Sequence, residues 1–355
     1  MRTGIALKVI SGAAVNSVED VARYVTVWCA AGVTAIDICA DFHVVRAAVA
    51  AREDAAQRFG PEARSVKLMA SPTLPGDVHR LKSILDPDRC TNCNVCLPPV
   101  CPDDCIYPGE KVVSIETAKC RGCDACVEIC PHGALRLEPM PTPPLRDAVR
   151  VAIEAGADAV ELHLSGESPE AVRQHLEEVW PFLRPETLVS VCVGSQQSSP
   201  AEVIGVVRVV HEVRGSRPII IQVDGTTMGG RPGGIQALAL AELVLDQRLP
   251  NLFVIASGGV TELTWETAAR HQINISGLGI GIRSRELVRE ALEEPEVFAS
   301  DEMVLRIAEA ARILHRPAEF TSVETGRAFR GPALAKIGAI QRKKKDRVIS
   351  QEDLG

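Results

Sequence analysis

Short runs of aliphatic and β-branched residues alternate along the chain with longer stretches in which apolar residues recur at helical spacing. The short runs predict eight strands, at residues 5–11, 35–40, 65–70, 159–164, 188–193, 218–223, 251–256 and 276–282. The longer stretches predict helices at residues 18–31, 44–59, 145–154, 168–183, 201–213, 235–246, 262–271 and 285–293. Eight strand–helix units in series predict an α/β fold, a closed TIM-like (β/α)8 barrel of parallel strands, with an open doubly wound sheet as the alternative.

One segment interrupts this alternation after the third predicted strand. It is bounded by prolines at 72–75 and 139–144, which make semi-rigid hinges. The pattern predicts four parts: residues 1–80 and 142–296 form the barrel, 81–141 form an insert, and 297–355 form a C-terminal helix with a basic tail. An insert at this point replaces the third strand-to-helix loop, on the barrel face where active sites are built.

The insert holds two runs of cysteines. The second run is Cys120-x2-Cys123-x2-Cys126-x3-Cys130-Pro131, which matches the bacterial ferredoxin signature for [4Fe–4S] clusters. The first run is Cys90-x2-Cys93-x2-Cys96-x4-Cys101-Pro102, which has one residue more before its last cysteine. Short predicted strands at residues 111–116 and 134–138 complete a ferredoxin-like module. Zinc ribbons use paired C-x2-C knuckles, and a disulfide scaffold suits a small secreted chain, so these two alternatives fit less well.

In two-cluster ferredoxins the fourth cysteine of each run ligates the other cluster. The expected ligands of cluster one are therefore Cys90, Cys93, Cys96 and Cys130. Those of cluster two are Cys120, Cys123, Cys126 and Cys101. Cys105 is the alternative to Cys101, which is favoured because it is followed by proline as in the regular run.

Composition narrows the class of partners. The chain has 355 residues, 46% hydrophobic, 24% charged and 3% aromatic, with a net charge of −7. An acidic protein of this kind is not expected to bind nucleic acid, and no apolar run has the length of a membrane span. Because cluster cysteines must stay reduced, and no signal peptide is apparent, the expected location is the cytoplasm or a plastid stroma.

Several predicted barrel strands carry polar residues where an inert barrel would be aliphatic, namely Lys8, Asp37, Lys67, Glu161, His163, Gln222 and Asp224. Isolated charges are rarely buried without a partner. An inward-facing set of Lys8, Asp37, Lys67 and Glu161 could form an ion-paired structural layer. The same four residues are equally candidates for catalysis, with lysines facing an anion and carboxylates moving protons.

Glycines cluster at the ends of the last barrel strands. Gly258 and Gly259 follow the seventh strand, Gly279 and Gly281 end the eighth, and a Gly-rich loop at 225–234 follows the sixth. Barrels often bind phosphate in these loops, where glycine lets backbone amides approach closely. The pattern predicts a phosphate-bearing cofactor such as FMN, although glycines that only serve to turn the chain would look the same.

The cysteine-rich insert stands between the barrel segments 7–13 and 35–41 and the segments 222–225 and 256–259. In this combination the chain resembles the LdpA-like iron–sulfur proteins of cyanobacteria and chloroplast-bearing organisms, up to about Leu292. The resemblance implies redox sensing, with a link to light input into the circadian clock. The basic tail, with Arg342 to Arg347, lies outside the resemblance.

These observations are consistent with three functions. The first is electron transfer or sensing of cellular or photosynthetic redox state, with a redox partner protein or a quinone or electron-carrier pool as partner. The second is a flavin-dependent oxidoreductase with FMN in the barrel mouth, fed by the clusters, a layout similar to enzymes that join a dihydroorotate-dehydrogenase-like barrel to ferredoxin clusters. The third is an assembly or scaffold protein that docks a partner through its tail.

Overall fold

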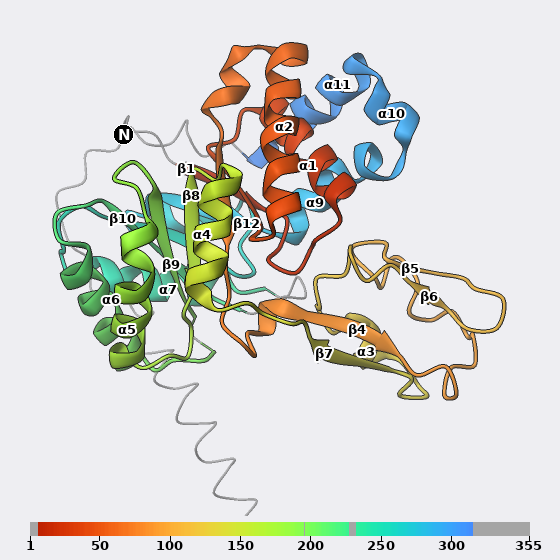
Figure 1. The fold of residues 1–355 in the computed structure, drawn as a ribbon, viewed down its shortest axis with the longest axis horizontal. Coiled ribbons are helices and arrows are strands. Elements are labelled where there is room, and N and C mark those ends of the chain that lie inside the picture. Colours follow the sequence, from red (N-terminus) through yellow and green to blue (C-terminus); the bar gives the residue numbers. More distant parts are fainter. Residues whose placement is uncertain (1–5, 195, 227–231, 315–355) are drawn as a thin grey trace, which may run out of the picture.

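Eight parallel strands close into a barrel in the computed structural model, which describes residues 6–194, 196–226 and 232–314. The strand order is β1-β12-β11-β10-β9-β8-β3-β2 (Figure 1). The strands are β1 (Ala6–Ile10), β2 (Ala35–Cys39), β3 (Lys67–Ser71), β8 (Ala159–His163), β9 (Leu188–Gly194), β10 (Ile219–Asp224), β11 (Leu252–Ser257) and β12 (Gly277–Ile280). The predicted closed barrel is confirmed, and the open doubly wound sheet is wrong.

The helices return the chain from one strand to the next. They are α1 (Val18–Ala31), α2 (Phe42–Phe59), α4 (Leu145–Ala155), α5 (Pro169–Val179), α6 (Pro200–Arg214), α7 (Gly234–Leu245), α8 (Thr264–Arg270) and α9 (Ile282–Glu293). Short 3-10 turns lie at η1 (Pro61–Ser65), η2 (Val78–Arg80) and η3 (Trp180–Phe182). All eight predicted helices are present within a few residues of their expected bounds.

Local chemistry sets the helix ends. The Ser17 side chain accepts a hydrogen bond from the backbone N–H of Asp20 at the start of α1, and Gly32 ends the helix with a φ of 79°, which glycine adopts freely. At the other end of the barrel sequence, Gly281 is the N-cap of α9. The predicted strand 276–282 therefore ends at Ile280, and α9 begins three residues before its predicted start.

The barrel interior has two levels. Near the N-terminal ends of the strands, Met69, Ala159, Ile220 and Ile255 form an apolar cluster. Above it, toward the C-terminal ends, buried polar side chains replace the aliphatic ones. The larger aliphatic core lies between the strands and the helices around them. The apolar cluster closes the bottom of the barrel, so a ligand could enter only from the C-terminal face.

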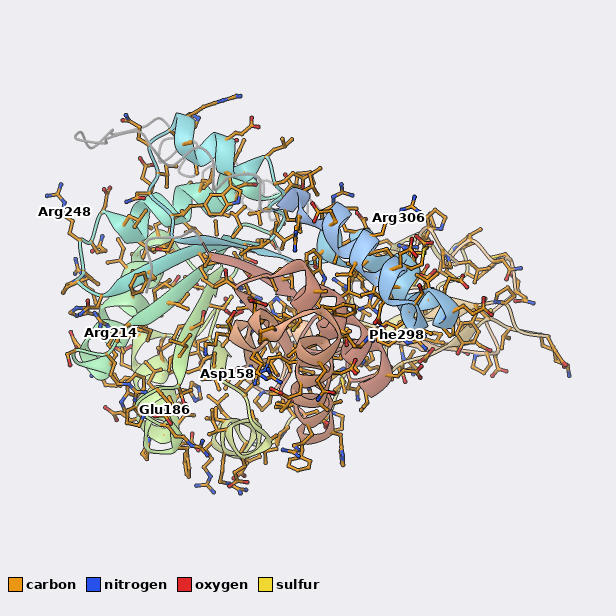
Figure 2. All side chains as sticks on the ribbon, turned by 90° about the horizontal axis from the view of Figure 1, so that it is seen from above. Asp158, Glu186, Arg214, Arg248, Phe298 and Arg306 are labelled. Carbon is orange, nitrogen blue, oxygen red and sulfur yellow. The ribbon has the colours of Figure 1, made fainter. Side chains whose placement is uncertain are left out.

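Two further helices, α10 (Pro295–Ala299) and α11 (Asp301–Ala311), pack beside α1, α2 and α9. Arg58 of α2 joins them, because its guanidinium lies 5.4 Å from the centre of the Phe298 ring and its Nε is 2.8 Å from Asp301 Oδ1. Figure 2 labels Phe298 at this contact. The predicted C-terminal helix is thus present as α11, whereas the basic tail lies outside the described residues.

The insert follows β3 and returns at α4, and in Figure 1 it projects from the barrel to the right. It contains an antiparallel pair, β4 (Leu81–Leu85) with β7 (Leu135–Pro139), and a shorter pair, β5 (Ile106–Tyr107) with β6 (Ser114–Ile115). A short helix, α3 (Ala125–Ile129), lies in the second cysteine run. The predicted insertion after the third strand is confirmed. None of the helices in the described ranges has the length and apolar character needed to cross a membrane.

Candidate functional site

The cysteines of the insert gather around two separate hollows. The first hollow is lined by Cys90, Cys93 and Cys96 of the first run and by Cys130 of the second run. Cys96 is buried, whereas Cys93 is exposed to solvent. The four sulfurs from two distant segments meet because β4 pairs with β7, which brings the two ends of the insert together.

The second hollow is lined by Cys120, Cys123 and Cys126 of the second run, together with Cys101 and Cys105 of the first. Each hollow therefore offers at least four cysteine sulfurs, three from one loop and the rest from the other. Four thiolates are the usual ligand set of a [4Fe–4S] cluster, so the residues present fit that group.

Backbone amides point at several of these sulfurs. The N–H of Ser83 donates to Cys120 Sγ at 3.4 Å, and the N–H of Ala134 donates to Cys130 Sγ at 3.3 Å. Cys101 Sγ receives the N–H of Cys105 in the same manner, at 3.4 Å. The Cys105 Sγ lies 3.3 Å from Cys101 Sγ, so the sulfurs of Cys101 and Cys105 both reach the second hollow.

The second hollow faces the barrel. Lys82 of β4 is buried there, and its Nζ donates to the carbonyl oxygens of Ala14 at 2.6 Å and Cys120 at 2.7 Å. The backbone N–H of Asn16 also donates to the carbonyl of Ala118, at 2.9 Å. The loop between β1 and α1 is therefore joined to the second cysteine run through polar contacts, which fix the insert against the barrel.

Arg121, between two of the predicted ligands, connects the insert to the barrel pocket. It is buried, and its Nε lies 2.9 and 2.7 Å from the two carboxylate oxygens of Asp103. Arg285 of α9 reaches the same carboxylate at 3.1 Å and also pairs with Asp20 of α1. Because Arg121 lines both the second hollow and the barrel pocket, these two sites share a wall.

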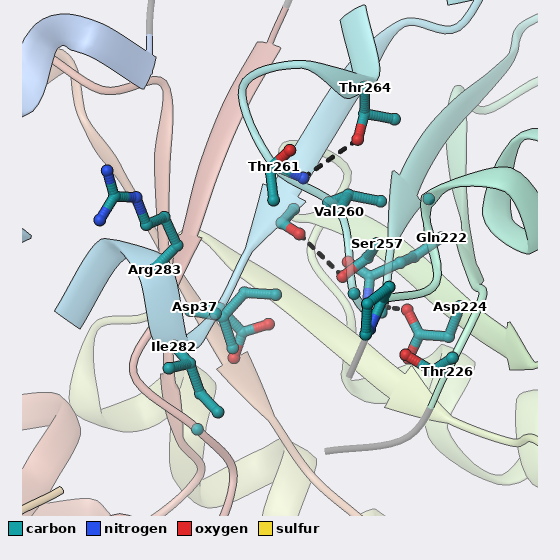
Figure 3. A pocket seen from close by; sticks show the side chains of 18 of the residues that line it. Asp37, Gln222, Asp224, Thr226, Ser257, Val260, Thr261, Thr264, Ile282 and Arg283 are labelled. Carbon is teal, nitrogen blue, oxygen red and sulfur yellow. Dashed lines mark hydrogen bonds between the residues drawn. The ribbon is translucent and has the colours of Figure 1, made fainter. Parts of the chain in front are cut away.

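The barrel pocket opens at the C-terminal ends of the strands and has a volume of about 510 Å³. Gly258, Gly259, Gly279 and Gly281 all line it, as do Arg283 and the start of α9. Figure 3 shows Asp37 and Arg283 at the left of the pocket and Gln222 and Asp224 at the right, with Thr261 and Thr264 above. A pocket of this size is within the range of cofactor sites. Residues 227–231 of the Gly-rich loop after β10 lie outside the described residues.

At the floor of the pocket, three of the four charged candidates form one buried group, and two of them, Asp37 and Glu161, line the pocket. Lys8 Nζ lies 2.6 Å from Glu161 Oε2 and 3.0 Å from Asp37 Oδ2. The hydroxyl of Ser190 donates to Glu161 at 2.8 Å, and that of Ser71 donates to Asp37 at 2.5 Å. Lys8 is thus held by two carboxylates and is not among the residues that line the pocket, which favours the ion-paired layer of the two expectations.

Lys67 does not join this group. It lies on the same side of β3 as Met69 and Ser71, but at the first residue of the strand, where it is exposed. Alternation along a strand fixes the side on which a residue lies but not its height in the barrel. The expectation that Lys67 faces the pocket is therefore wrong.

Charge pairing controls ionisation in the group. Burial alone would lower the pKa of Lys8, but Glu161 and Asp37 hold it above its usual value. Burial would also lower the pKa of His163, whereas Glu161 and Asp77 raise it to about 9. Burial raises the pKa of Asp37, while that of Glu161 is held low by Lys8 and His163 in spite of its burial. The layer therefore combines two cations with carboxylates, as expected for an ion-paired structure.

The other polar residues predicted on the strands also lie at the pocket. Gln222 donates to Asp224 at 3.2 Å, and the thiol of Cys192 donates to the same carboxylate at 3.3 Å. Two residues not predicted from the sequence, His79 and Arg121, line the pocket as well. Their positions in the sequence could have indicated a place at the pocket, because His79 lies just before the insert and Arg121 lies within the second cysteine run.

Comparisons with known proteins agree with this two-part organisation. Residues 151–319 match the family model described as the Light dependent period A C-terminal domain, and residues 113–136 match a 4Fe-4S binding domain. The NADH-dependent phenylglyoxylate dehydrogenase subunit delta of Aromatoleum evansii is 33% identical over 67 residues, which are 19% of this chain and 71% of that protein. The pyruvate synthase subunit PorD of Methanothermobacter marburgensis is 36% identical over 63 residues, 18% of this chain and 73% of that protein. The insert is therefore a ferredoxin-type, metal-binding segment.

Solved structures similar to the whole chain include a putative deoxyribose-phosphate aldolase from Toxoplasma gondii, with a TM-score of 0.45 and 12% identity over 82% of this chain and 93% of that one. The protein named Light dependent period A from Synechococcus elongatus is 26% identical over 361 residues, which are 96% of this chain and 95% of that protein. Together with the match to the C-terminal domain, this similarity identifies the chain as LdpA-like, with a ferredoxin-type iron–sulfur segment.

Proposed function

We propose that this protein binds two [4Fe–4S] clusters and uses them to exchange electrons with a redox partner, in response to the redox state of the cell. The observation that carries the proposal is the crossed grouping of the cysteines, because each hollow takes three from one run and at least one from the other. That grouping is the ligation pattern of two-cluster ferredoxins. A cluster of this kind supplies one-electron chemistry.

We assign cluster one to the hollow with Cys90, Cys93, Cys96 and Cys130. Cluster two belongs to the hollow with Cys120, Cys123, Cys126 and Cys101. Cys101 is preferred over Cys105 because its sulfur accepts a backbone N–H, as those of Cys120 and Cys130 do. Hydrogen bonds of this type tune the sulfur ligands of iron–sulfur clusters.

The two hollows differ in what surrounds them, which suggests different roles. Around the first, Cys93 is exposed, and Val95 and Ile129 expose 42% and 48% of their surface. Exposed apolar side chains beside a cluster suit contact with a redox partner protein. The second hollow instead lies against the barrel through Lys82 and Arg121. We therefore propose that a partner docks at the first hollow, while the second communicates with the barrel.

The number of clusters is tested by counting iron and acid-labile sulfide in protein purified without oxygen. Two clusters predict about eight of each per chain. Cys123→Ser should remove about half of both, and Cys29→Ser, a buried cysteine outside the insert, should leave the counts unchanged. Stoichiometric zinc without labile sulfide would contradict the proposal.

A second candidate is a flavin-dependent oxidoreductase. The specific observation in its favour is that the pocket lined by Gly258, Gly259, Gly279 and Gly281 shares Arg121 with the second hollow. The glycine backbone and the start of α9 would hold the phosphate of FMN. Gly258 and Gly259 both have positive φ, at 70° and 76°, so their substitution would strain the loop itself. Gly281 is the better position for a test, because a Cβ added there meets no atom within 4 Å.

Titration of the cluster-loaded protein with FMN, followed by flavin fluorescence, tests this function. Gly281→Asp should weaken binding by at least about tenfold, since a carboxylate would stand against the phosphate. Gly281→Ala is the matched control and should bind like the wild type. If the wild-type protein does not quench FMN fluorescence, the flavin proposal fails, and the barrel is better explained as a scaffold for the clusters.

We also propose a cellular location for this protein and a way in which a partner docks on it. The cytoplasm or a plastid stroma would keep the cluster cysteines reduced. The scaffold hypothesis depends on the basic tail, so it predicts that a partner is captured by the full chain and lost after removal of residues 315–355.

A further inference from the structure

Three side chains that the clusters do not use converge at the wall of the barrel pocket, and one of them, His163, also pairs with Glu161 of the charged layer. Asp77 and His79 lie at η2, directly before the insert, and His163 is the last residue of β8. A β-bridge between Thr73 and His163 brings the segment after β3 alongside the end of β8. The backbone therefore brings together the two segments that carry these side chains.

The donor atoms of the three residues are within reach of a single ion. His163 Nδ1 lies 3.2 Å from His79 Nδ1, and His79 Nδ1 lies 2.7 Å from Asp77 Oδ1. His163 Nδ1 is 3.8 Å from Asp77 Oδ2. Metal–nitrogen and metal–oxygen bonds of about 2.0–2.2 Å put adjacent ligand atoms about 3–3.5 Å apart. The three atoms therefore need to move little to surround one cation.

Glu161 orients the ring of His163. Its Oε1 atom is buried without a hydrogen-bond partner among the described residues and lies 3.6 Å from His163 Nε2. The other oxygen, Oε2, is fixed by Lys8 at 2.6 Å and Ser190 at 2.8 Å. Metal binding would displace the proton from Nδ1, while the proton on Nε2 still faces this carboxylate. Metal-binding histidines are commonly oriented by a carboxylate in this way.

We propose that Asp77, His79 and His163 bind one divalent transition-metal ion at the barrel mouth. Two imidazoles and one carboxylate suit Zn²⁺ or Fe²⁺ and differ from the all-cysteine hollows of the insert. His79 and His163 also line the 510 Å³ pocket, so a remaining coordination position would open toward a ligand there. Three protein ligands with one open position are typical of catalytic sites, whereas structural zinc is enclosed by four. This site requires neither a flavin nor a particular number of clusters.

The same contacts could instead be a hydrogen-bonded chain from Asp77 through the two histidines, and zinc binding separates the two interpretations. Cluster-loaded full-length protein is incubated with Zn²⁺ without oxygen and desalted, and zinc is counted by mass spectrometry. X-ray absorption at the zinc edge then identifies the ligands. One zinc per chain, with nitrogen and oxygen neighbours at about 2.0–2.1 Å, is expected. Sulfur neighbours at about 2.3 Å would place the zinc at cysteines and overturn the proposal, as would the absence of bound zinc.

His79→Ala should lower the affinity for zinc by more than about tenfold and reduce the imidazole signal of any zinc still bound, because only His163 then supplies an imidazole. His43 provides a matched control. Asp41 accepts a hydrogen bond from the backbone N–H of His43 at 2.8 Å, as Asp77 does from that of His79, but His43 is exposed at the start of α2. His43→Ala should therefore keep the zinc. Unchanged iron content in both variants shows that the fold is intact, and wild-type zinc binding by a folded His79→Ala protein would rule the site out.

Discussion

Arg121 and Asp103 form a two-pronged ion pair inside the insert, in which Nε of the arginine lies 2.7 Å from Oδ2 and Nη2 lies 2.5 Å from Oδ1. The pair is buried at the junction between the second cysteine run and the barrel pocket. An arginine at this place lies beside two predicted thiolate ligands, where its positive charge offsets theirs. The cysteine signature alone does not specify a residue of this type between Cys120 and Cys123.

Replacing Arg121 should make the second cluster lose its iron more readily. Arg121→Ala leaves the buried carboxylate of Asp103 with Arg285 alone, and breaking a buried pair costs about 3–5 kcal/mol. Arg121→Lys keeps the charge but not the two-pronged geometry, so its effect should be intermediate. The rate at which each variant releases iron to a chelator at raised temperature measures how firmly the second cluster is held. Arg136→Ala, on an exposed pair with Glu138, should behave like the wild type, and equal rates for all variants would contradict the prediction.

The fourth ligand of cluster two can be identified by spectroscopy. If Cys101 is the ligand, Cys101→Ser should change the electron paramagnetic resonance signal of one reduced cluster. Cys105→Ser should then leave both signals close to those of the wild type, because its thiol only neighbours the ligand. The reverse result would assign Cys105, and a change in both variants would show that the two sulfurs exchange as ligand.

The contact between α9 and the insert should depend on pH through Glu293. Glu293 keeps 43% of its side-chain surface exposed, but partial desolvation and the neighbouring Asp104 raise its pKa to about 7, against the opposing effect of Arg289 and Arg285. A raised carboxyl pKa means that the folded protein holds an extra proton between about pH 4.3 and 7. The contribution of Glu293 to the free energy of unfolding is therefore fully present below about pH 4.3, and it is lost as the pH rises through about 7.

Glu293→Gln carries no charge at any pH, so it should melt at a higher temperature than the wild type at pH 8. The two proteins should melt together near pH 5. Glu290→Gln, on an exposed residue of the same helix, is the control and should show no such difference. A Glu293→Gln advantage that persists unchanged at pH 5 would argue against titration of this residue as the cause.

The sequence predicts those features that depend on local periodicity and spacing. The eight strand–helix units follow from apolar spacing, and the insert is recognised by Cys120 to Cys130. Contacts across the junction could not be predicted, because the pairing of Lys82 with Ala14 depends on how the insert docks. His79 was also missed, since its Asp-x-His context is the same as that of His43, and only the fold brings His163 beside it. Lys67 shows the limit of alternation, which gives a face but not a depth.

The last prediction concerns the role of the charged layer at the floor of the pocket. Lys8 is the cation shared by Asp37 and Glu161, and it is 1% exposed. Lys8→Met should destabilise the protein by about 3–5 kcal/mol, because it leaves two carboxylates buried without their partner. Adding Asp37→Asn removes one of these charges, while Glu161 keeps Ser190 and His163, so the double variant should recover more than half of the loss.

Lys67→Met tests whether replacing any lysine on a barrel strand would destabilise the protein as much as Lys8→Met. Lys67 is exposed at the start of β3, and its replacement should change stability by no more than about 0.5 kcal/mol. Chemical denaturation under anaerobic conditions, with the clusters intact, gives all three values. Recovery by Asp37→Asn would identify the layer as an ion-paired support for the pocket floor. A Lys8→Met protein as stable as the wild type would instead show that Lys8 is not needed to hold the carboxylates, and would return it to the candidates for direct action on a ligand.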